Sequence, residues 1–231
     1  MRKELELTAI DPTSSHRGAE PKVRYYFCDA EQQSQAVQQG MWIFIVQEIM
    51  FFGGLFMAYI LYRTLYPHSF AAGSYHLDVR LGTANTAVLL VSSFTMATAV
   101  RCTQVRQRAG TVISLLLTAL LGVVFLGIKG HEYAVKFHEH LVPGPDFVWH
   151  GAGNPHHVEM FFNLYFAMTG LHALHMVIGV GLVLVLVVRA MRGTFNEGYN
   201  DPVGVVGLYW HFVDLIWIFL FPLLYLVGRH H

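Results

Sequence analysis

Five long apolar segments limit the possible folds of this chain more than any other feature. They comprise residues 41–62, 82–100, 111–128, 160–188 and 204–227. A helix needs about 20 apolar residues to cross about 30 Å of hydrocarbon. Charged residues make up only 13% of the chain, whereas about 25% is usual in soluble proteins. The sequence therefore predicts an all-α, polytopic membrane protein that folds as a bundle of five transmembrane helices.

The polar segments between the spans predict an orientation. Residues 1–40 are interpreted as a polar cytoplasmic tail, and residues 41–231 as one transmembrane domain. With the N-terminus inside, ten Lys and Arg residues are cytoplasmic and five are outside. The positive-inside rule then places the C-terminus and a long loop, residues 130–159, on the outer side. The polar start predicts no cleavable signal peptide, and zero formal net charge gives no reason to expect a nucleic-acid partner.

Five ionisable side chains lie inside the spans: Glu48, His172, His175, His211 and Asp214. Such residues are costly at bilayer depth and normally face a protein interface, a cavity or each other. Two hypotheses remain open for the glutamate in the first span. It is either a protonated, hydrogen-bonded acid at a helix interface or an acid linked to proton movement or to another subunit.

The depth of the polar residues predicts how the last two spans pack. At 1.5 Å per residue, His175 lies about 20 Å and Asp214 about 15 Å from the inner boundary. We therefore expect these two residues to pair, with His211 sharing the carboxylate from one turn away. The polar face of the fifth span would then pack on the fourth. A proton relay is an alternative, as is a bis-histidine haem, which requires imidazoles from two helices at one depth.

The sequence offers no catalytic motif or standard metal site. Segment 130–159 holds six histidines: His131, His138, His140, His150, His156 and His157. Their spacing fits no usual ligand pattern, and no cysteine accompanies them. We find no nucleophile triad or phosphate-binding glycine loop. We therefore expect no catalytic, cofactor-binding or metal-binding residue in this chain. A transporter is a weaker alternative, because no repeat or broken helix is visible.

The order of these motifs resembles the subunit III family of cytochrome c oxidases, among the haem–copper respiratory oxidases. The resemblance covers all five spans and is carried by residues 40–52, 84–93, 125–133, 169–175 and 209–214. Within them, the family-matching polar residues are Glu48, His172, His175, His211 and Asp214, with Glu132 and Tyr133 at the outer edge. Many family members have seven helices, so this chain is similar to the shorter, five-helix bacterial form. Lys129 stands where a neutral residue is frequent, and we expect it to snorkel to the outer membrane edge.

The resemblance implies a non-catalytic subunit in the inner (plasma) membrane of a bacterium. Such a subunit packs against and stabilises catalytic subunit I and supports proton uptake, in a complex that reduces oxygen with electrons from cytochrome c. Haem and copper are then expected in partner subunits I and II, and bound phospholipid in contact with the chain. Two alternatives share the scaffold, a quinol oxidase and a nitric oxide reductase complex, because the donor and haem types belong to other subunits. A haem-bearing membrane anchor is the alternative from another class.

Overall fold

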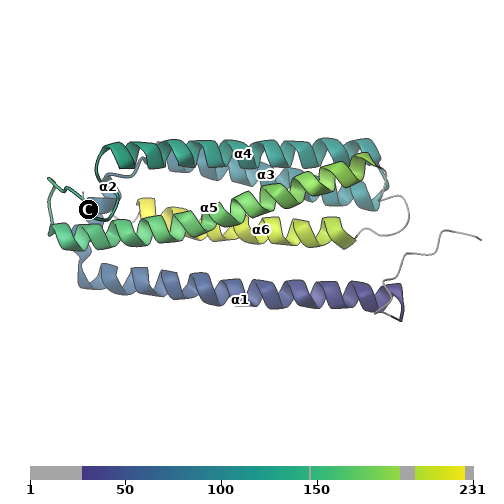
Figure 1. Cartoon of the computed structure of the whole chain (residues 1–231), viewed down its shortest axis with the longest axis horizontal. Helices are drawn as coiled ribbons and strands as arrows, with labels where there is room; N and C mark the ends of the chain where they lie inside the picture. The colour runs from purple at the N-terminus through teal and green to yellow at the C-terminus, as the bar shows by residue number, and fades with distance from the viewer. Residues whose placement is uncertain (1–27, 146, 193–200, 227–231) are drawn as a thin grey trace, which may run out of the picture.

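Long helices lie side by side in a computed structural model of the chain (Figure 1), which describes residues 28–145, 147–192 and 201–226. The elements are α1 (Ala30–Leu65), α2 (Pro67–Tyr75), α3 (Val79–Gln104), α4 (Arg108–His138), α5 (Pro155–Met191), α6 (Asp201–Phe221) and the π-helical turn η2 (Pro222–Leu226). No strand occurs within these ranges. Five helices are long and apolar enough to cross a membrane. The predicted all-α architecture with five spans is therefore confirmed.

The helices extend well beyond the predicted spans. Helix α4 continues to His138 and α5 already begins at Pro155, so the predicted outer loop 130–159 is too long at both ends. Residues after Gly130 include good helix formers, and Glu132 and Lys136 repeat at helical spacing with their side chains buried. Helix α1 begins at Ala30, so the end of the predicted polar tail is helical. Residues 1–27 of that tail lie outside the described residues.

A short helix follows the first span where we expected only a connection. Proline at the first position of α2 suits a helix start, because its missing N–H has no helical partner there. The Phe70 ring packs at 5.4 Å from Tyr59 and at 5.6 Å from Phe161 of α5. The Ser74 hydroxyl donates a 2.9 Å hydrogen bond to the Leu224 carbonyl. Helix α2 thereby ties the ends of α1, α5 and η2 together.

Helix α6 forms the centre of the bundle. Helices α3 and α4 run side by side, α5 crosses them at a slant, and α1 lies at the edge (Figure 1). Helix α6 contacts α1, α3 and α5, and its Trp210 and Trp217 are almost fully buried. A Cβ on Gly122 would lie 2.8 Å from the Trp210 ring. Glycine at this position therefore lets α4 approach α6 closely enough to hold the tryptophan.

Candidate functional site

The carboxyl group of Glu48 pairs with a histidine near the middle of the bundle. Glu48 is 8% exposed, and its Oε2 lies 3.3 Å from Nε2 of His175 in α5. The other ring nitrogen of His175, Nδ1, lies 2.8 Å from the carbonyl oxygen of Leu171. The Phe52 ring packs edge-on against the imidazole at 5.5 Å. The first span thus meets α5 through an acid and a base.

This pair is suited to holding one proton. A carbonyl oxygen only accepts hydrogen bonds, so Nδ1 of His175 must carry a proton. Nε2 is then unprotonated in the neutral ring and faces a protonated Glu48, or it is protonated and faces a carboxylate. In both arrangements a single proton lies between the two side chains. The geometry therefore permits a proton to be stored or passed at this point.

The predicted pairing of His175 with Asp214 is wrong, and so is the predicted sharing of that carboxylate by His211. Nδ1 of His211 instead lies 2.7 Å from the Ser93 hydroxyl of α3. Depth fixes the level of a residue in the bundle, whereas the direction of its side chain depends on rotation about the helix axis. His211 and Asp214 are three residues apart and share the side of α6 that lies toward α3, where Ser93 also interacts with the carboxyl group.

Several side chains of α6 bond to α3 rather than to α5. The indole N–H of Trp210 donates to the Ser92 hydroxyl, and that of Trp217 donates to the Thr86 hydroxyl, each at 3.1 Å. The expectation that the polar face of the last span packs on the fourth is therefore wrong for this face. Tyr209 is the exception, because its hydroxyl donates to the His175 carbonyl at 3.0 Å.

His172 lies in an aromatic enclosure that does not fit a haem. Its ring centroid is 5.1 Å from Trp217 and 5.5 Å from Phe125, and the residue is 1% exposed. A bis-histidine haem needs free imidazole nitrogens from two helices that face a common space. His175 lies on the same helix and faces Glu48, while His211 bonds to α3. Among the described residues, therefore, no pair of intramembrane histidines is arranged to bind a haem.

A second buried cluster centres on Lys129, which we expected to snorkel to the membrane edge. That expectation is wrong, because Lys129 is 3% exposed and its ammonium lies 2.9 Å from Glu132. The ammonium also donates to the hydroxyls of Tyr165 at 3.3 Å and Tyr225 at 2.9 Å. Both hydroxyls donate in turn to Oε1 of Glu132, at 3.0 and 2.6 Å. Since the ion pair is fully enclosed by α4, α5 and η2, it holds these three elements together.

The sequence contained a signal for this cluster that our reading overlooked. Lys129 and Glu132 are opposite charges three residues apart, which places them on the same face of a helix. Tyr165 lies in α5, and Tyr225 follows Pro222 in η2, so the two tyrosines join the pair only through tertiary packing. Tyr133, the neighbour expected at the outer edge, instead bonds through its hydroxyl to Thr169 at 2.5 Å.

The six histidines of segment 130–159 do not gather in one place along the chain. His131 and His138 are exposed on α4, His156 and His157 belong to the first turn of α5, and the other two lie in the connection. His157 stacks on Tyr66 at 3.7 Å. Among the described residues, no group of three His, Cys, Asp or Glu side chains is arranged to hold a metal ion.

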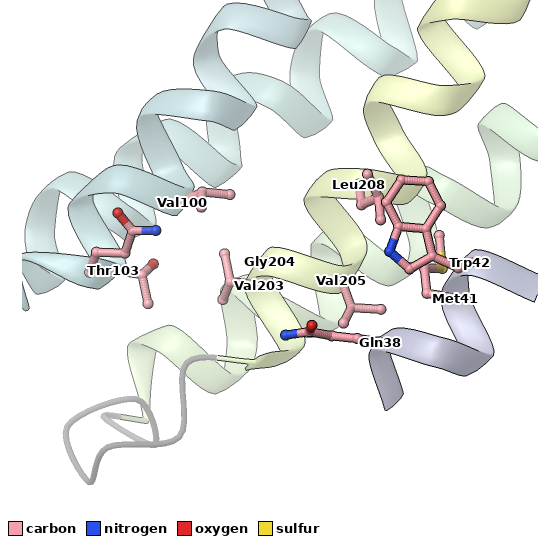
Figure 2. A pocket seen from close by; sticks show the side chains of 10 residues that line it. Gln38, Met41, Trp42, Val100, Thr103, Val203, Gly204, Val205 and Leu208 are labelled. Carbon is pink, nitrogen blue, oxygen red and sulfur yellow. The ribbon is translucent and has the colours of Figure 1, made fainter. Parts of the chain in front are cut away.

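A cavity of about 400 Å³ lies near the beginning of α1 (Figure 2). It is enclosed by α1, α3 and α6, and Gln38 points from α1 toward Val203 of α6. The lining residues are Gln38, Met41, Trp42, Val100, Thr103, Gln104, Val203, Gly204, Val205 and Leu208. None of them is titratable, so this cavity suits a largely apolar occupant with a polar end rather than acid–base chemistry.

Comparison with known proteins agrees with the order of motifs along the chain. The sequence model of cytochrome c oxidase subunit III matches residues 25–140 and 154–229. Cytochrome c oxidase subunit 3 of Thermostichus vulcanus is 34% identical over 194 residues, which cover 82% of this chain and 87% of that protein. The same subunit of Corynebacterium diphtheriae is 33% identical, with 83% and 88% covered. The probable quinol oxidase subunit 3 of Staphylococcus haemolyticus is 27% identical, with 85% and 91% covered. This multi-pass membrane protein, a member of an oxidoreductase complex, therefore belongs to the cytochrome c oxidase subunit III family.

Proposed function

We propose that this chain is the non-catalytic subunit III of a haem–copper oxidase in a bacterial plasma membrane, where it packs against catalytic subunit I. The carrying observation is that its intramembrane histidines are used inside the chain. His175 pairs with Glu48, His211 bonds to Ser93, and His172 is enclosed by aromatic rings. The redox centres then belong to partner subunits I and II.

Purification of the native complex tests this assignment. A tag on this chain should bring down a haem-containing partner from mildly solubilised membranes, while the separated chain has no Soret absorption. Recovery of the chain as a haem-free homo-oligomer would contradict the assignment. A Soret band on the isolated chain that is lost in His172→Ala would instead support the haem-bearing anchor.

The electron donor we propose is cytochrome c. Relatives named cytochrome c oxidase subunit 3 are 32–34% identical to this chain in three cases, while those named quinol oxidase subunit 3 are 27–29% identical. The purified complex should therefore oxidise reduced cytochrome c and leave a soluble quinol unoxidised. The reverse preference would assign it to the quinol oxidases.

The outer face of α1 is the surface we propose for contact with subunit I. Gln47 lies near the middle of this 36-residue helix and its side chain is exposed. Lipid offers an amide no hydrogen-bond partner, whereas a polar side chain of another helix does. By contrast, the exposed side chains of α4 between Ile113 and Val124 are all apolar, as expected for a lipid-facing surface.

Cross-linking separates the two faces. A cysteine at position 47, carrying a short photoreactive linker, should cross-link to the haem-bearing subunit in native membranes. A cysteine at Leu116 on α4 serves as the matched control and should label lipid only. Cross-links from Leu116 and none from Gln47 would assign the contact to α4, even if the complex still copurifies.

Support of proton uptake is the role we propose for Glu48. It forms half of a pair that holds one proton at the middle of the bundle. In proteoliposomes, Glu48→Gln should slow proton uptake during turnover without removing the chain from the complex. Glu31→Gln, the same change in the exposed first turn of α1, should leave the rate unchanged. Equal rates for all three proteins would rule out this role.

The proposed orientation places the start of α1 in the cytoplasm. Cysteines introduced at Gln107 and His140, after both native cysteines are replaced by serine, report the two sides of the bundle. An impermeant reagent added to intact cells should label position 140 and leave position 107 unlabelled. The cavity of Figure 2 then lies near the cytoplasmic leaflet, where its apolar wall and exposed Trp42 suit a phospholipid chain.

A further inference from the structure

Three deeply buried side chains around Trp217 carry polar atoms without a hydrogen-bond partner. They are both amide atoms of Asn85, both ring nitrogens of His172 and both carboxyl oxygens of Asp214. These residues are 0%, 1% and 3% exposed. More than nine in ten buried polar groups in proteins bond to protein or to ordered water. Six orphaned atoms in one region of a core therefore require a partner.

Trp217 brings the three residues to one level of the bundle. Its indole N–H bonds to Thr86, the chain neighbour of Asn85 in α3. Its ring lies 5.1 Å from that of His172 in α5. Asp214 precedes it by three residues in α6, which places both on the same side of that helix. The orphaned atoms thus come from three different helices and meet around one side chain.

Two bonded networks lie on either side of this region. The Lys129 ammonium of α4 is 5.1 Å from the Trp217 ring centroid, and it interacts electrostatically with His172. One turn along α5 from His172, His175 pairs with Glu48 of α1. Both networks satisfy their own charged groups, so neither supplies a partner for the orphaned atoms between them.

We propose that Asn85, His172 and Asp214 form a binding site for internal water molecules within the membrane-spanning bundle. The amide offers donors and an acceptor, a neutral imidazole offers one of each, and the carboxyl oxygens accept. Water matches such a mixed set because it both donates and accepts, and a buried molecule typically makes about three hydrogen bonds. A metal ion suits it less well, because among the described residues no three acidic, histidine or cysteine side chains converge.

The bound waters connect parts of the core that no protein hydrogen bond joins. They bridge α3, α5 and α6 at the level of Trp217, between the Glu48–His175 pair and the Lys129–Glu132 pair. Protons of the Asp214 and His172 side chains thereby exchange with solvent water, although both residues lie deep within the bundle. This site is independent of the proposed role in the complex, because all of its residues belong to this chain.

Cryo-electron microscopy of the intact complex in lipid nanodiscs tests the site directly. At a resolution that resolves waters elsewhere in this chain, density should appear within hydrogen-bond distance of Asp214 and of a His172 ring nitrogen. A map that resolves waters in other polar regions of the chain and none between these residues would overturn the proposal.

Stability measurements give an independent test, since wet and dry sites respond oppositely to leucine. In a hydrated site, Asp214→Leu removes an anchor for the waters that serve Asn85 and His172. The dissociation temperature of this chain from the complex should then fall by about 2–4 °C or more. In a dry site, leucine removes an unpaired buried carboxyl group, and an unchanged or higher temperature would contradict the proposal.

Two further variants control for disruption of the helix. Asp214→Asn still bonds to water and should stay within about 2 °C of the unmodified chain. Leu215→Ala alters an exposed neighbour in α6 and reports the effect of changing this helix outside the site. A loss as large in Asp214→Asn as in Asp214→Leu would indicate a direct protein contact and count against bridging water.

Discussion

Oε2 of Glu48 lies 3.3 Å from Nε2 of His175, across the interface between α1 and α5. Helix α1 lies at the edge of the bundle (Figure 1), and its membrane-spanning segment is the least buried of the five. Buried groups of Glu48, Phe52 and Tyr59 face the other helices, while the opposite face is exposed. The acid–base contact therefore stabilises the attachment of a helix that has limited packing.

This contact predicts different outcomes for two substitutions of Glu48. Glu48→Gln should leave the subunit in the complex, because an amide N–H₂ can donate to Nε2 of His175 in the same space. Glu48→Leu should destabilise the attachment of α1 by about 1–3 kcal/mol, since it leaves that nitrogen without a partner. Thermal dissociation of the complex measures both effects. Loss of the subunit in Glu48→Gln would show that the carboxyl group itself is required for assembly.

Ser93→Ala should destabilise the packing of α6 on α3. It removes the hydroxyl that lies 2.7 Å from His211, and an interhelical bond of this kind is worth about 0.6 kcal/mol and up to about 2. Thr83→Ala is the matched control, because that hydroxyl donates to Val79 within its own helix. Chemical denaturation in detergent compares the two. Equal losses in both variants would assign the effect to α3 alone.

Lys129→Met should be among the most destabilising single changes in the bundle. It leaves Glu132 buried without its cation, and breaking a buried ion pair costs about 3–5 kcal/mol. Adding Glu132→Gln should restore much of the loss, because a neutral amide still accepts from Tyr165 and Tyr225. The free energies of unfolding of both single variants and the double variant form the test. Simple additivity of the two losses would mean that the ion pair is not coupled.

Two glycines of α4 predict opposite responses to alanine. In Gly122→Ala the new Cβ would lie 2.8 Å from Trp210 and from Val180, so overpacking should cost about 1–3 kcal/mol. In Gly127→Ala the new Cβ meets nothing within 4 Å, and the higher helix propensity of alanine should stabilise by up to about 1 kcal/mol. The melting temperature of the purified complex distinguishes them. A loss in both variants would indicate a general sensitivity of α4.

The sequence by itself determined the number and type of the membrane-spanning elements. Apolar length is a local property, and lipid leaves a spanning segment little choice but to be helical. The same sequence identified Glu48, His172, His175, His211 and Asp214 as polar residues that need partners. The family followed from the order of the motifs in which they stand.

The tertiary structure alone decided which partner each residue has. His175 and Asp214 lie at similar depth, yet rotation about the helix axis places one beside Glu48 of α1 and the other on the side of α6 toward α3. Helix ends were also beyond sequence reasoning, because burial of Lys129, Glu132 and Lys136 extends α4 past the last apolar residue of the predicted span. Depth can be counted along a chain, whereas direction and contact depend on how the helices pack around Trp210 and Trp217.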